Sequence, residues 1–467
     1  MAFHEPDQGN LCVEITSSTT TTSTTFYHVQ VTVDACQWLV EHRYSAFADL
    51  NSQLVSDKLI PLDLLPGKKI IGNREPAFVD RRRQDLNTYI KRVVALLQLN
   101  MPDVLAKFLE LETYDIGWML RRQAFFCFVH EGAYVGGQRQ LQMTPMEVQG
   151  LTRLVREGRA DSFFHESKLS TAPSQVVDVA SQTPSLRVAG SWQPLARSNV
   201  RPHTYAFSLE LFRSLRKLSL HDVPVSSLAS LAALRDRLVE LSVSGGAVRD
   251  VRDVLLCGEL HRDAPAADAR PLWTCLRHLA LRDNHIRSVD ETAAALAPQL
   301  TSLDVSTNAV EHIGYLAELP ALRQLNLSNN CLTDVPDLHT RLGNVARLRL
   351  SQNRIGSLAP FARLFSLVQL DLSFNQVQEV EEVGRLRGLP CLEDLSLVGN
   401  PVTTAIDYRA RALERLGPRA PHVTLDNEQS SQAQLDRVLV MQALRTAREG
   451  GPEFLRRGWH GRVVTIV

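Results

Sequence analysis

The chain has 467 residues, of which 44% are hydrophobic and 6% aromatic, and its 51 Lys and Arg balance 51 Asp and Glu. This length is enough for about two or three domains with buried cores. The balanced charge argues against a general nucleic-acid-binding protein, and no apolar run reaches the ~18 residues of a membrane-spanning helix.

The cysteines and histidines follow no catalytic or metal-binding spacing. The seven cysteines are scattered without a C-x-x-C pair, which fits reduced thiols in a cytosolic protein. The 14 histidines include no H-E-x-x-H motif, and the chain has no phosphate-loop, dinucleotide or nucleophile-elbow glycine motif. The first ten residues contain two acids and no apolar core, unlike a secretory signal. We therefore expect a cytoplasmic binding protein rather than an enzyme, with no cofactor and no metal site.

Residues 10–114 predict an α+β domain. The segments CVEIT, FYHVQVTV and QWLVEHRY have the composition and alternation of three strands. The run SSTTTTSTT at 17–25, between the first two, is expected to be a long polar hairpin loop. Apolar residues at helical spacing follow at 47–55, at about 79–98 and at about 102–112. Three strands followed by helices make an α+β domain.

Residues 115–204 predict a helical and flexible linker. Helices are expected at about 117–130 and 145–157, where apolar residues recur at helical spacing. Residues 169–200 are rich in Ser, Ala and Pro, which is the composition of a flexible linker.

An internal repeat dominates the rest of the chain. The pattern L-x-x-L-x-L-x-x-N-x-L recurs in six clear copies, whose starts lie 24, 22, 23, 22 and 25 residues apart. This period is typical of leucine-rich repeats. Two earlier copies, from Leu215 and Leu238, lack the Asn and fit the atypical start of a stack. The clear copies begin at Leu276, Leu300, Leu322, Val345, Leu367 and Leu392.

These copies predict an α/β leucine-rich-repeat solenoid over 205–427. Each L-x-L should form one short strand, and each Asn should bond backbone groups of neighbouring turns. An inserted surface loop is expected at about 257–273. A helix at about 405–416 and a final edge strand should form the C-terminal cap. The tail, 428–467, predicts one more helix at about 431–448.

Stacked strands of this kind present a concave sheet, on which repeat proteins bind their partners. The positions between the leucines should line that sheet, and their mixed charge favours a protein partner over a nucleic acid. The predicted lining residues are His278, Arg282, Asp304, Gln324, Asn326, Arg347, Arg349, Gln369, Asp371 and Asp394.

Three basic elements of the N-terminal domain point to a phosphate ligand. Arg43 and Tyr44 end a strand, Lys68 follows a Pro-Gly turn, and Arg82 lies near the start of a helix. A guanidinium fork matches a phosphate, a Lys supplies a point charge, and an aromatic face covers a sugar-like ring. The motifs R-Y-S-x-F, LDLLPGKK and R-x-x-x-L-x-x-Y, in this order, resemble the phox-homology (PX) domain, a phosphoinositide-reading module.

The resemblance implies a role for each of these side chains. The lipid-binding residues would be Arg43 on the 3-phosphate, Tyr44 on the inositol ring, Lys68 on the 1-phosphate and Arg82 on the 4- and 5-hydroxyls. The membrane-insertion residues would be Ile70 and Ile71. The residue before Arg43 is His42, where many family members carry a second Arg. Residues 1–113 hold 11 Lys and Arg against 14 Asp and Glu, a net charge of −3, so binding should depend on a pocket rather than on general attraction to acidic membranes.

The order of a PX-like domain and leucine-rich repeats resembles nischarin-like proteins, the imidazoline receptor candidate family. The likeness runs through HRYSAF, LLPGKKIIG and LPCLEDLSLVGNP. It implies a scaffold, peripheral on endosomes, that binds phosphatidylinositol 3-phosphate and recruits small GTPases, kinases and integrin tails in migration and trafficking. The alternative is a cytosolic repeat adaptor, or a phosphatase or cytoskeletal regulator, whose PX-like domain does not bind lipid. An enzyme with an unrecognised site is a third reading.

Overall fold

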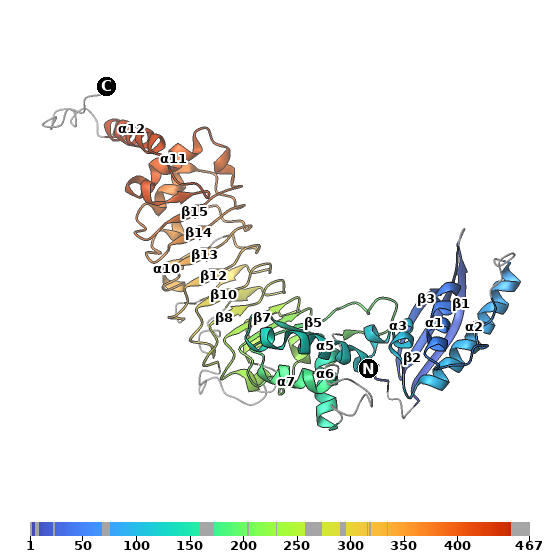
Figure 1. Ribbon diagram of the computed structural model, residues 1–467. Helices are drawn as coiled ribbons and strands as arrows, with labels where there is room; N and C mark the ends of the chain where they lie inside the picture. The colour runs from blue at the N-terminus through green and yellow to red at the C-terminus, as the bar shows by residue number, and fades with distance from the viewer. Residues whose placement is uncertain are drawn as a thin grey trace. The chain divides into compact units, whose positions relative to one another are not determined.

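The computed structural model describes most of the chain in two compact units, Met1–Leu234 and Arg235–Val467. Strands and helices of both units are labelled in Figure 1. The described residues are 2–4, 9–21, 24–67, 75–158, 172–202, 205–229, 231–256, 273–289, 296–314, 316, 319–333 and 335–449.

The first unit begins with a three-stranded antiparallel sheet of order β1-β2-β3, and four helices follow it. Alternate strand residues are buried, as the sequence pattern predicts, and α2 packs against β1. The predicted helix at 102–112 divides in two because Glu110 adopts a left-handed φ of 54°. The elements are β1 (Leu11–Thr20), β2 (Thr25–Val33), β3 (Cys36–Arg43), α1 (Tyr44–Ser56), α2 (Pro76–Leu97), α3 (Asp103–Phe108) and α4 (Leu111–Tyr114).

The prediction of a long polar loop at 17–25 is wrong. β1 continues to Thr20 and pairs with Thr25 of β2, so only a short turn separates the strands. The Oγ1 atoms of these two threonines lie 3.1 Å apart, and the His28 ring bonds the hydroxyl of Ser17 at 3.0 Å. Threonine is β-branched and favours strands, so a polar Thr run extends the ladder instead of ending it.

The prediction of a flexible linker at 169–200 is also wrong for the part that forms α7 and β5. The apolar residues of this part decide the outcome, because Val176 and Val179 of α7 and Leu186 of β5 are fully buried. The two helices predicted earlier in this region are confirmed as α5 and α6. The elements are α5 (Ile116–Val135), β4 (Leu141–Met143), α6 (Pro145–Arg156), α7 (Pro173–Gln182) and β5 (Ser185–Ala189).

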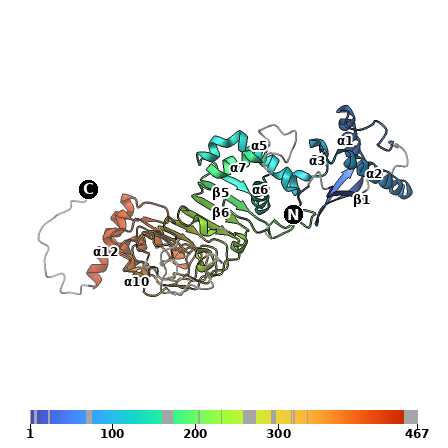
Figure 2. The same cartoon turned by 90° about the horizontal axis from the view of Figure 1, so that it is seen from below.

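The parallel ladder of the first unit starts earlier than the sequence repeat. β4 pairs in parallel with β5, and β5 with β6 (Lys217–His221), in a register that aligns Leu141, Leu186 and Leu218. Figure 2 shows α5, α6 and α7 beside β5 and β6. Two strands therefore precede the first copy that the sequence reveals. Two short 3-10 helices, η4 (Val225–Ser227) and η5 (Leu231–Leu234), complete this unit.

Residues 194–200, which we call the clasp, pair with the edge of β3. The Leu39 N–H donates to the Arg197 carbonyl, and the Asn199 N–H donates to the Gln37 carbonyl, each at 3.0 Å. The Asn199 side-chain oxygen accepts a hydrogen bond from the Gln37 N–H at 2.7 Å. The clasp thus satisfies backbone groups of an edge strand that would otherwise be open to pairing with other chains.

The second unit is a stack of parallel strands, one for each repeat, which confirms the predicted solenoid architecture. The strands pair in register, so the central leucines of neighbouring repeats face one another inside the stack. They are β7 (Glu240–Ser244), β8 (His278–Ala280), β10 (Ser302–Asp304), β12 (Gln324–Asn326), β13 (Arg347–Arg349), β14 (Gln369–Asp371), β15 (Asp394–Ser396) and β16 (Thr424–Leu425). A second, two-stranded sheet joins β9 (Ser288–Val289) and β11 (His312–Ile313).

Short helices return the chain between these strands, and longer ones close the C-terminal end. The predicted cap helix, edge strand and tail helix are confirmed as α11, β16 and α12. The helices are α8 (Val251–Leu255), α10 (Leu338–Arg341), η8 (Ala359–Phe361), η9 (Val380–Leu386), η10 (Pro401–Thr404), α11 (Tyr408–Leu416), η11 (Gly417–His422) and α12 (Gln432–Glu449). The loop predicted at 257–273 lies outside the described residues except for Trp273, which is buried and donates its indole N–H to Leu255.

The repeat asparagines hold neighbouring turns together, as predicted. Asn353 is 7% exposed, and its Nδ2 donates to the carbonyls of Leu327 and Leu350 at 3.0 and 2.9 Å. Its Oδ1 accepts a hydrogen bond from the Leu332 N–H at 3.1 Å. Each such amide pairs buried backbone groups that the repeat itself leaves open.

Candidate functional site

Arg82 lies between two aromatic rings in the first unit. Arg82 is 6% exposed, and its Cζ is 4.4 Å from the ring centroid of Tyr44 and 4.3 Å from the ring centroid of Phe78. Phe78 and Arg82 are one turn apart on α2, whereas Tyr44 begins α1. A guanidinium in this position gains cation–π attraction on both faces while its N–H edge stays available for hydrogen bonds.

The same cluster positions the Pro-Gly turn. The Tyr44 hydroxyl donates to the Pro66 carbonyl at 2.6 Å, and Arg82 Nη2 donates to the Gly67 carbonyl at 3.3 Å. Burial raises the pKa of the Tyr44 hydroxyl, although the charge of Arg82 opposes this shift. The hydroxyl therefore stays protonated and keeps donating to the turn.

Arg43 directly precedes Tyr44 in the chain. It is the N-cap residue of α1, its side chain makes no capping hydrogen bond, and it is exposed. Within the described residues, neither Arg43 nor Arg82 forms an ion pair with a carboxylate. Two arginines without an acidic partner in the described residues thus adjoin Tyr44, Arg43 as its neighbour in the chain and Arg82 over its ring, and such a pair suits an anion.

The sequence predicts three further lipid contacts. Lys68, Ile70 and Ile71 lie outside the described residues. His42 points away from Arg43, because its ring stacks on Phe108 at 3.9 Å between centroids and contacts the Phe108 carbonyl through Nε2 at 2.7 Å. His42 is therefore a packing residue at the position where many PX domains carry a second Arg.

In the second unit, Asp304 is engaged inside the repeats. Its residue is 8% exposed, and its carboxylate accepts hydrogen bonds from Arg282, Asn326 and Ser306. Burial raises the pKa of Asp304, but these hydrogen bonds outweigh it and hold the pKa below the ordinary value. Arg282, Asp304 and Asn326 were all predicted to bind a partner, but here they bind one another, so fewer of their polar groups are available to a partner.

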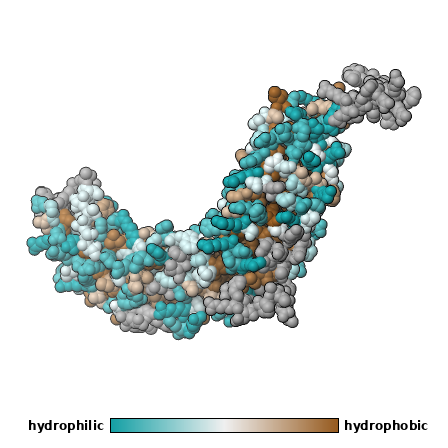
Figure 3. Space-filling model, turned by 180° about the vertical axis from the view of Figure 1, so that it is seen from behind, coloured by the Kyte–Doolittle hydropathy of each residue, from teal (hydrophilic) through white to brown (hydrophobic). Residues whose placement is uncertain are grey.

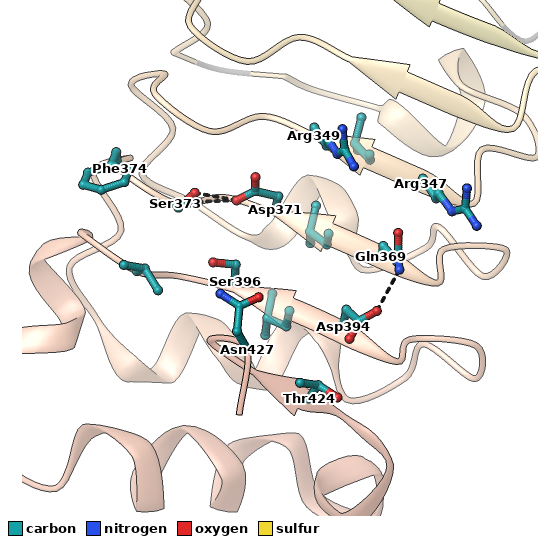
Figure 4. Close-up of a pocket in the computed structure, with 14 residues that line it drawn as sticks. Arg347, Arg349, Gln369, Asp371, Ser373, Phe374, Asp394, Ser396, Thr424 and Asn427 are labelled. Atoms are coloured by element: carbon teal, nitrogen blue, oxygen red, sulfur yellow. Dashed lines mark hydrogen bonds between the residues drawn. The ribbon is translucent and has the colours of Figure 1, made fainter. Parts of the chain in front are cut away.

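A hollow of about 460 Å³ opens over the strands β13 to β16 (Figure 4). Arg347 and Arg349 of β13 line it, and neither guanidinium has a partner in the described part of the chain. The acids are engaged, since Gln369 Nε2 donates to Asp394 at 2.8 Å and Asp371 accepts from the Ser373 N–H at 3.0 Å. The structure thus brings together Arg347, Arg349, Gln369, Asp371 and Asp394 of the predicted set, while His278 lies on β8 outside this hollow.

Sequence reasoning missed two apolar residues of this hollow, Phe374 and Val398. They are 57% and 39% exposed, although most of the repeat surface visible in Figure 3 is hydrophilic. Both lie just beyond the strands, and the prediction considered only strand positions. The signal was present, because Phe374 precedes the repeat Asn at a position where the other clear copies carry a polar residue or Gly.

Comparison with known proteins agrees with both halves of this architecture. The PX domain family matches residues 30–112, and the leucine-rich repeat family matches residues 274–332. The first domain is a PX domain, and the strand stack is a leucine-rich-repeat solenoid. Both are recognition modules and typically non-catalytic.

Individual relatives match parts of the chain. Human serine/threonine-protein kinase 11-interacting protein is 30% identical over 211 residues, which cover 45% of this chain and 19% of that protein. An uncharacterized leucine-rich repeat-containing protein of Schizosaccharomyces pombe is 34% identical over 140 residues, 29% of this chain and 22% of that protein. The chain therefore spans about a fifth of the length of these relatives. A designed CISK-PX domain is 26% identical with a TM-score of 0.19, covering 21% of this chain and 96% of that one.

None of the described helices is long and apolar enough to cross a membrane. In the same part of the chain, no group of three His, Cys, Asp or Glu side chains is arranged to hold a metal ion.

Proposed function

We propose that this protein is a phosphoinositide-binding adaptor, peripheral on endosomes, that recruits signalling proteins through its leucine-rich repeats. Its PX domain would bind phosphatidylinositol 3-phosphate. By its resemblance to nischarin-like proteins, its partners would be small GTPases, kinases and integrin tails, with effects on migration and trafficking. The proposal rests chiefly on one observation: Arg82 is buried between Tyr44 and Phe78 without a carboxylate partner.

Burial of an unpaired guanidinium is unfavourable, so a protein gains from keeping one where an anion or a set of hydroxyls completes its hydrogen bonds. Arg82 is held by two rings, the Gly67 carbonyl and the Tyr27 hydroxyl, and its remaining N–H groups would meet the 4- and 5-hydroxyls of the inositol. Arg43, exposed at the N-terminus of α1, would bind the 3-phosphate. The positive end of the α1 helix dipole would also attract this 3-phosphate.

The other contacts of the headgroup follow the family resemblance. Tyr44 would cover the inositol ring, Lys68 would meet the 1-phosphate, and Ile70 and Ile71 would enter the bilayer interface. The net charge of −3 over residues 1–113 supports selection of a particular headgroup, because non-specific attraction to acidic lipids is weak for such a domain.

Sedimentation of the full chain with liposomes tests the lipid assignment. Each liposome preparation carries one phosphoinositide, and the wild type is compared with Arg43→Ala. Arg187→Ala is the matched control, because it removes another arginine of the first unit away from the cluster. We expect selective binding to phosphatidylinositol 3-phosphate that only the Arg43 variant loses. Absent binding, or binding that Arg43→Ala leaves unchanged, would favour a cytosolic repeat adaptor whose PX domain does not bind lipid.

Localisation in cells tests the endosomal assignment separately. A fluorescent fusion of the full chain should lie on endosomes and disperse when phosphoinositide 3-kinase is inhibited. A diffuse distribution that does not respond to the inhibitor would contradict it.

A further inference from the structure

One position of the repeat has the same unusual backbone conformation in successive copies. The residue before each repeat Asn has a left-handed φ, between 52° and 75°, because the chain turns there after the strand. Glycine and short polar residues accept this conformation at the least cost. The residues at this position are Asp283, Thr307, Asn329, Gln352, Phe374 and Gly399.

Phe374 is an exception among them. A bulky side chain is disfavoured at its φ of 55°, and with the residue 57% exposed the ring gains little from burial in return. Its ring lies against Gly399 of the next repeat, so closely that a Cβ on Gly399 would come within 2.5 Å of it. Neither the turn nor the core explains a phenylalanine here, which points to a contact outside the chain.

Around the Phe374 ring, the acidic side chains are hydrogen-bonded and the arginines are not. Figure 4 shows Arg347 and Arg349 along β13, with Asp371 and Asp394 on the next two strands and Phe374 at one end. Asp371 and Asp394 already accept hydrogen bonds from Ser373 and Gln369. The two arginine side chains make no hydrogen bond or ion pair in the described part of the chain. The hollow therefore offers two free cations and an exposed apolar end formed by Phe374 and Val398.

We propose that this hollow binds a partner's peptide segment that carries two acidic residues and one apolar side chain. The carboxylates would pair with Arg347 and Arg349, which lie two positions apart on the same face of β13, about 7 Å along the strand. The apolar side chain would pack on Phe374 and Val398. Single-stranded nucleic acid also uses arginines and aromatic rings, but it carries a phosphate at every nucleotide, and Asp371 and Asp394 beside the two arginines oppose such a continuous run of charge more than they oppose two spaced carboxylates.

This inference rests on the protein-binding half of the proposed function and adds the chemistry of the partner. Its test is selection of a random dodecapeptide library, displayed on phage, against the full chain. Enriched peptides are then synthesised, and their affinity is measured by fluorescence anisotropy for the wild type and two variants, Phe374→Asn and the double variant Arg347→Gln with Arg349→Gln. We expect peptides with two or more acids and an apolar residue, and a loss of about tenfold or more in affinity for each variant.

The variants are designed to separate binding from folding. Phe374→Asn installs the residue that Asn329 already provides at this turn, so the repeat should fold at least as well. Phe365→Asn is the matched control, because Phe365 is 58% exposed and does not line the hollow. Arg363→Gln is the corresponding control for the arginines, since Arg363 is exposed on the same repeat. Both controls should bind the peptides as the wild type does.

Several results would contradict the peptide-binding inference. Enrichment of basic or uncharged peptides, binding that survives both variants, or tighter binding of a poly-uridine oligonucleotide in this hollow would overturn the inference. Peptides that depend on His278 of β8 instead would overturn it while leaving a repeat adaptor intact. No enrichment at all would count against both, whatever the liposome result for the PX domain.

Discussion

Arg82 combines near-complete burial with the lack of a carboxylate partner in the described chain. A side chain in this state is usually destabilising unless aromatic contacts offset the loss of water. Here Tyr44 and Phe78 supply those contacts, and the Pro66–Gly67 turn is attached to the same cluster. A substitution of Arg82 should therefore separate the stability of the domain from its ligand binding.

Arg82→Met tests that separation. Methionine fills the space between the two rings and makes favourable sulfur–aromatic contacts, so the free energy of unfolding should fall by only about 1–3 kcal/mol, because the buried Tyr27 hydroxyl loses its hydrogen bond with Arg82. Binding to phosphatidylinositol 3-phosphate liposomes should be lost, because methionine offers no hydrogen bonds. Urea denaturation and liposome sedimentation on the same preparation provide both values. Retained lipid binding would show that Arg82 is a packing residue only.

His42 predicts a dependence of stability on pH. Burial lowers the pKa of His42 below the ordinary 6.5, and the hydrogen bond to Phe108 only partly opposes this. The folded domain thus favours the neutral ring, so its contribution to stability is present above pH 6.5 and is lost as the pH falls below that value. Between about pH 7.5 and about pH 5.5, the wild type should lose more stability than His42→Gln.

Urea midpoints of the two proteins at both pH values measure this difference. Asp115, whose pKa burial raises to about 7, titrates in both proteins, and so does His4, so their effects cancel in the comparison. Equal pH dependence in wild type and variant would show that the ring remains free to protonate in the folded state.

At the scale of elements, periodic patterns could be predicted and irregular ones could not. The repeat leucines and asparagines predict their strands and turns because the same spacing recurs six times. β4 and β5 escape the pattern, since α6 and α7 separate their short apolar runs and neither copy carries the Asn. The Thr run of β1 looks like a loop by polarity, and only its pairing with β2 makes it a strand.

In the candidate sites too, local patterns could predict the residues but not their contacts. Motif spacing predicted Arg43, Tyr44 and Arg82, and alternation along the strands predicted Arg347 and Arg349. The burial of Arg82 between rings and the engagement of Asp304 depend on residues distant in sequence, which no local pattern contains.

Asn353→Ala tests the amide ladder of the repeats. The substitution leaves the buried Leu332 N–H without its acceptor, at about 1–3 kcal/mol, whereas the Leu327 and Leu350 carbonyls each keep one amide donor, from Asn330 and Asn375. We expect a loss of about 1–3 kcal/mol in the unfolding free energy of the second unit, measured by urea denaturation. Asn344→Ala, at an exposed position, should cost less than about 0.5 kcal/mol.

Asn199→Ala tests the clasp. Without the Asn199 side chain, the Gln37 N–H loses its acceptor and the segment is held less firmly on β3. Hydrogen exchange measured by mass spectrometry should show faster exchange of the Gln37 and Leu39 amides, while β2 in the sheet interior keeps its protection. Gln193→Ala, an exposed position beside the clasp, is the control, and equal exchange in both variants would contradict the pairing.

At the scale of the molecule, the residues proposed to bind lipid and those proposed to bind a peptide belong to different units. Arg43 belongs to the first unit and Phe374 to the second, and sites that share no partners usually contribute additively. Arg43→Ala should therefore leave peptide affinity unchanged, and Phe374→Asn should leave liposome binding unchanged. The double variant should lose both activities to the extent that the single variants do. A change in peptide affinity when phosphatidylinositol 3-phosphate liposomes are added would instead reveal coupling between the sites.

The early start of the parallel ladder determines where the chain can be divided. A fragment starting at residue 205, where the recognisable repeats begin, would lack β4 and β5 and leave one side of β6 without its hydrogen-bonding partner. Leu218, which is buried and aligned with Leu186 in the ladder, would then meet water. Such a fragment should be poorly soluble and self-associate, whereas one starting at residue 115 keeps the strands that end the stack.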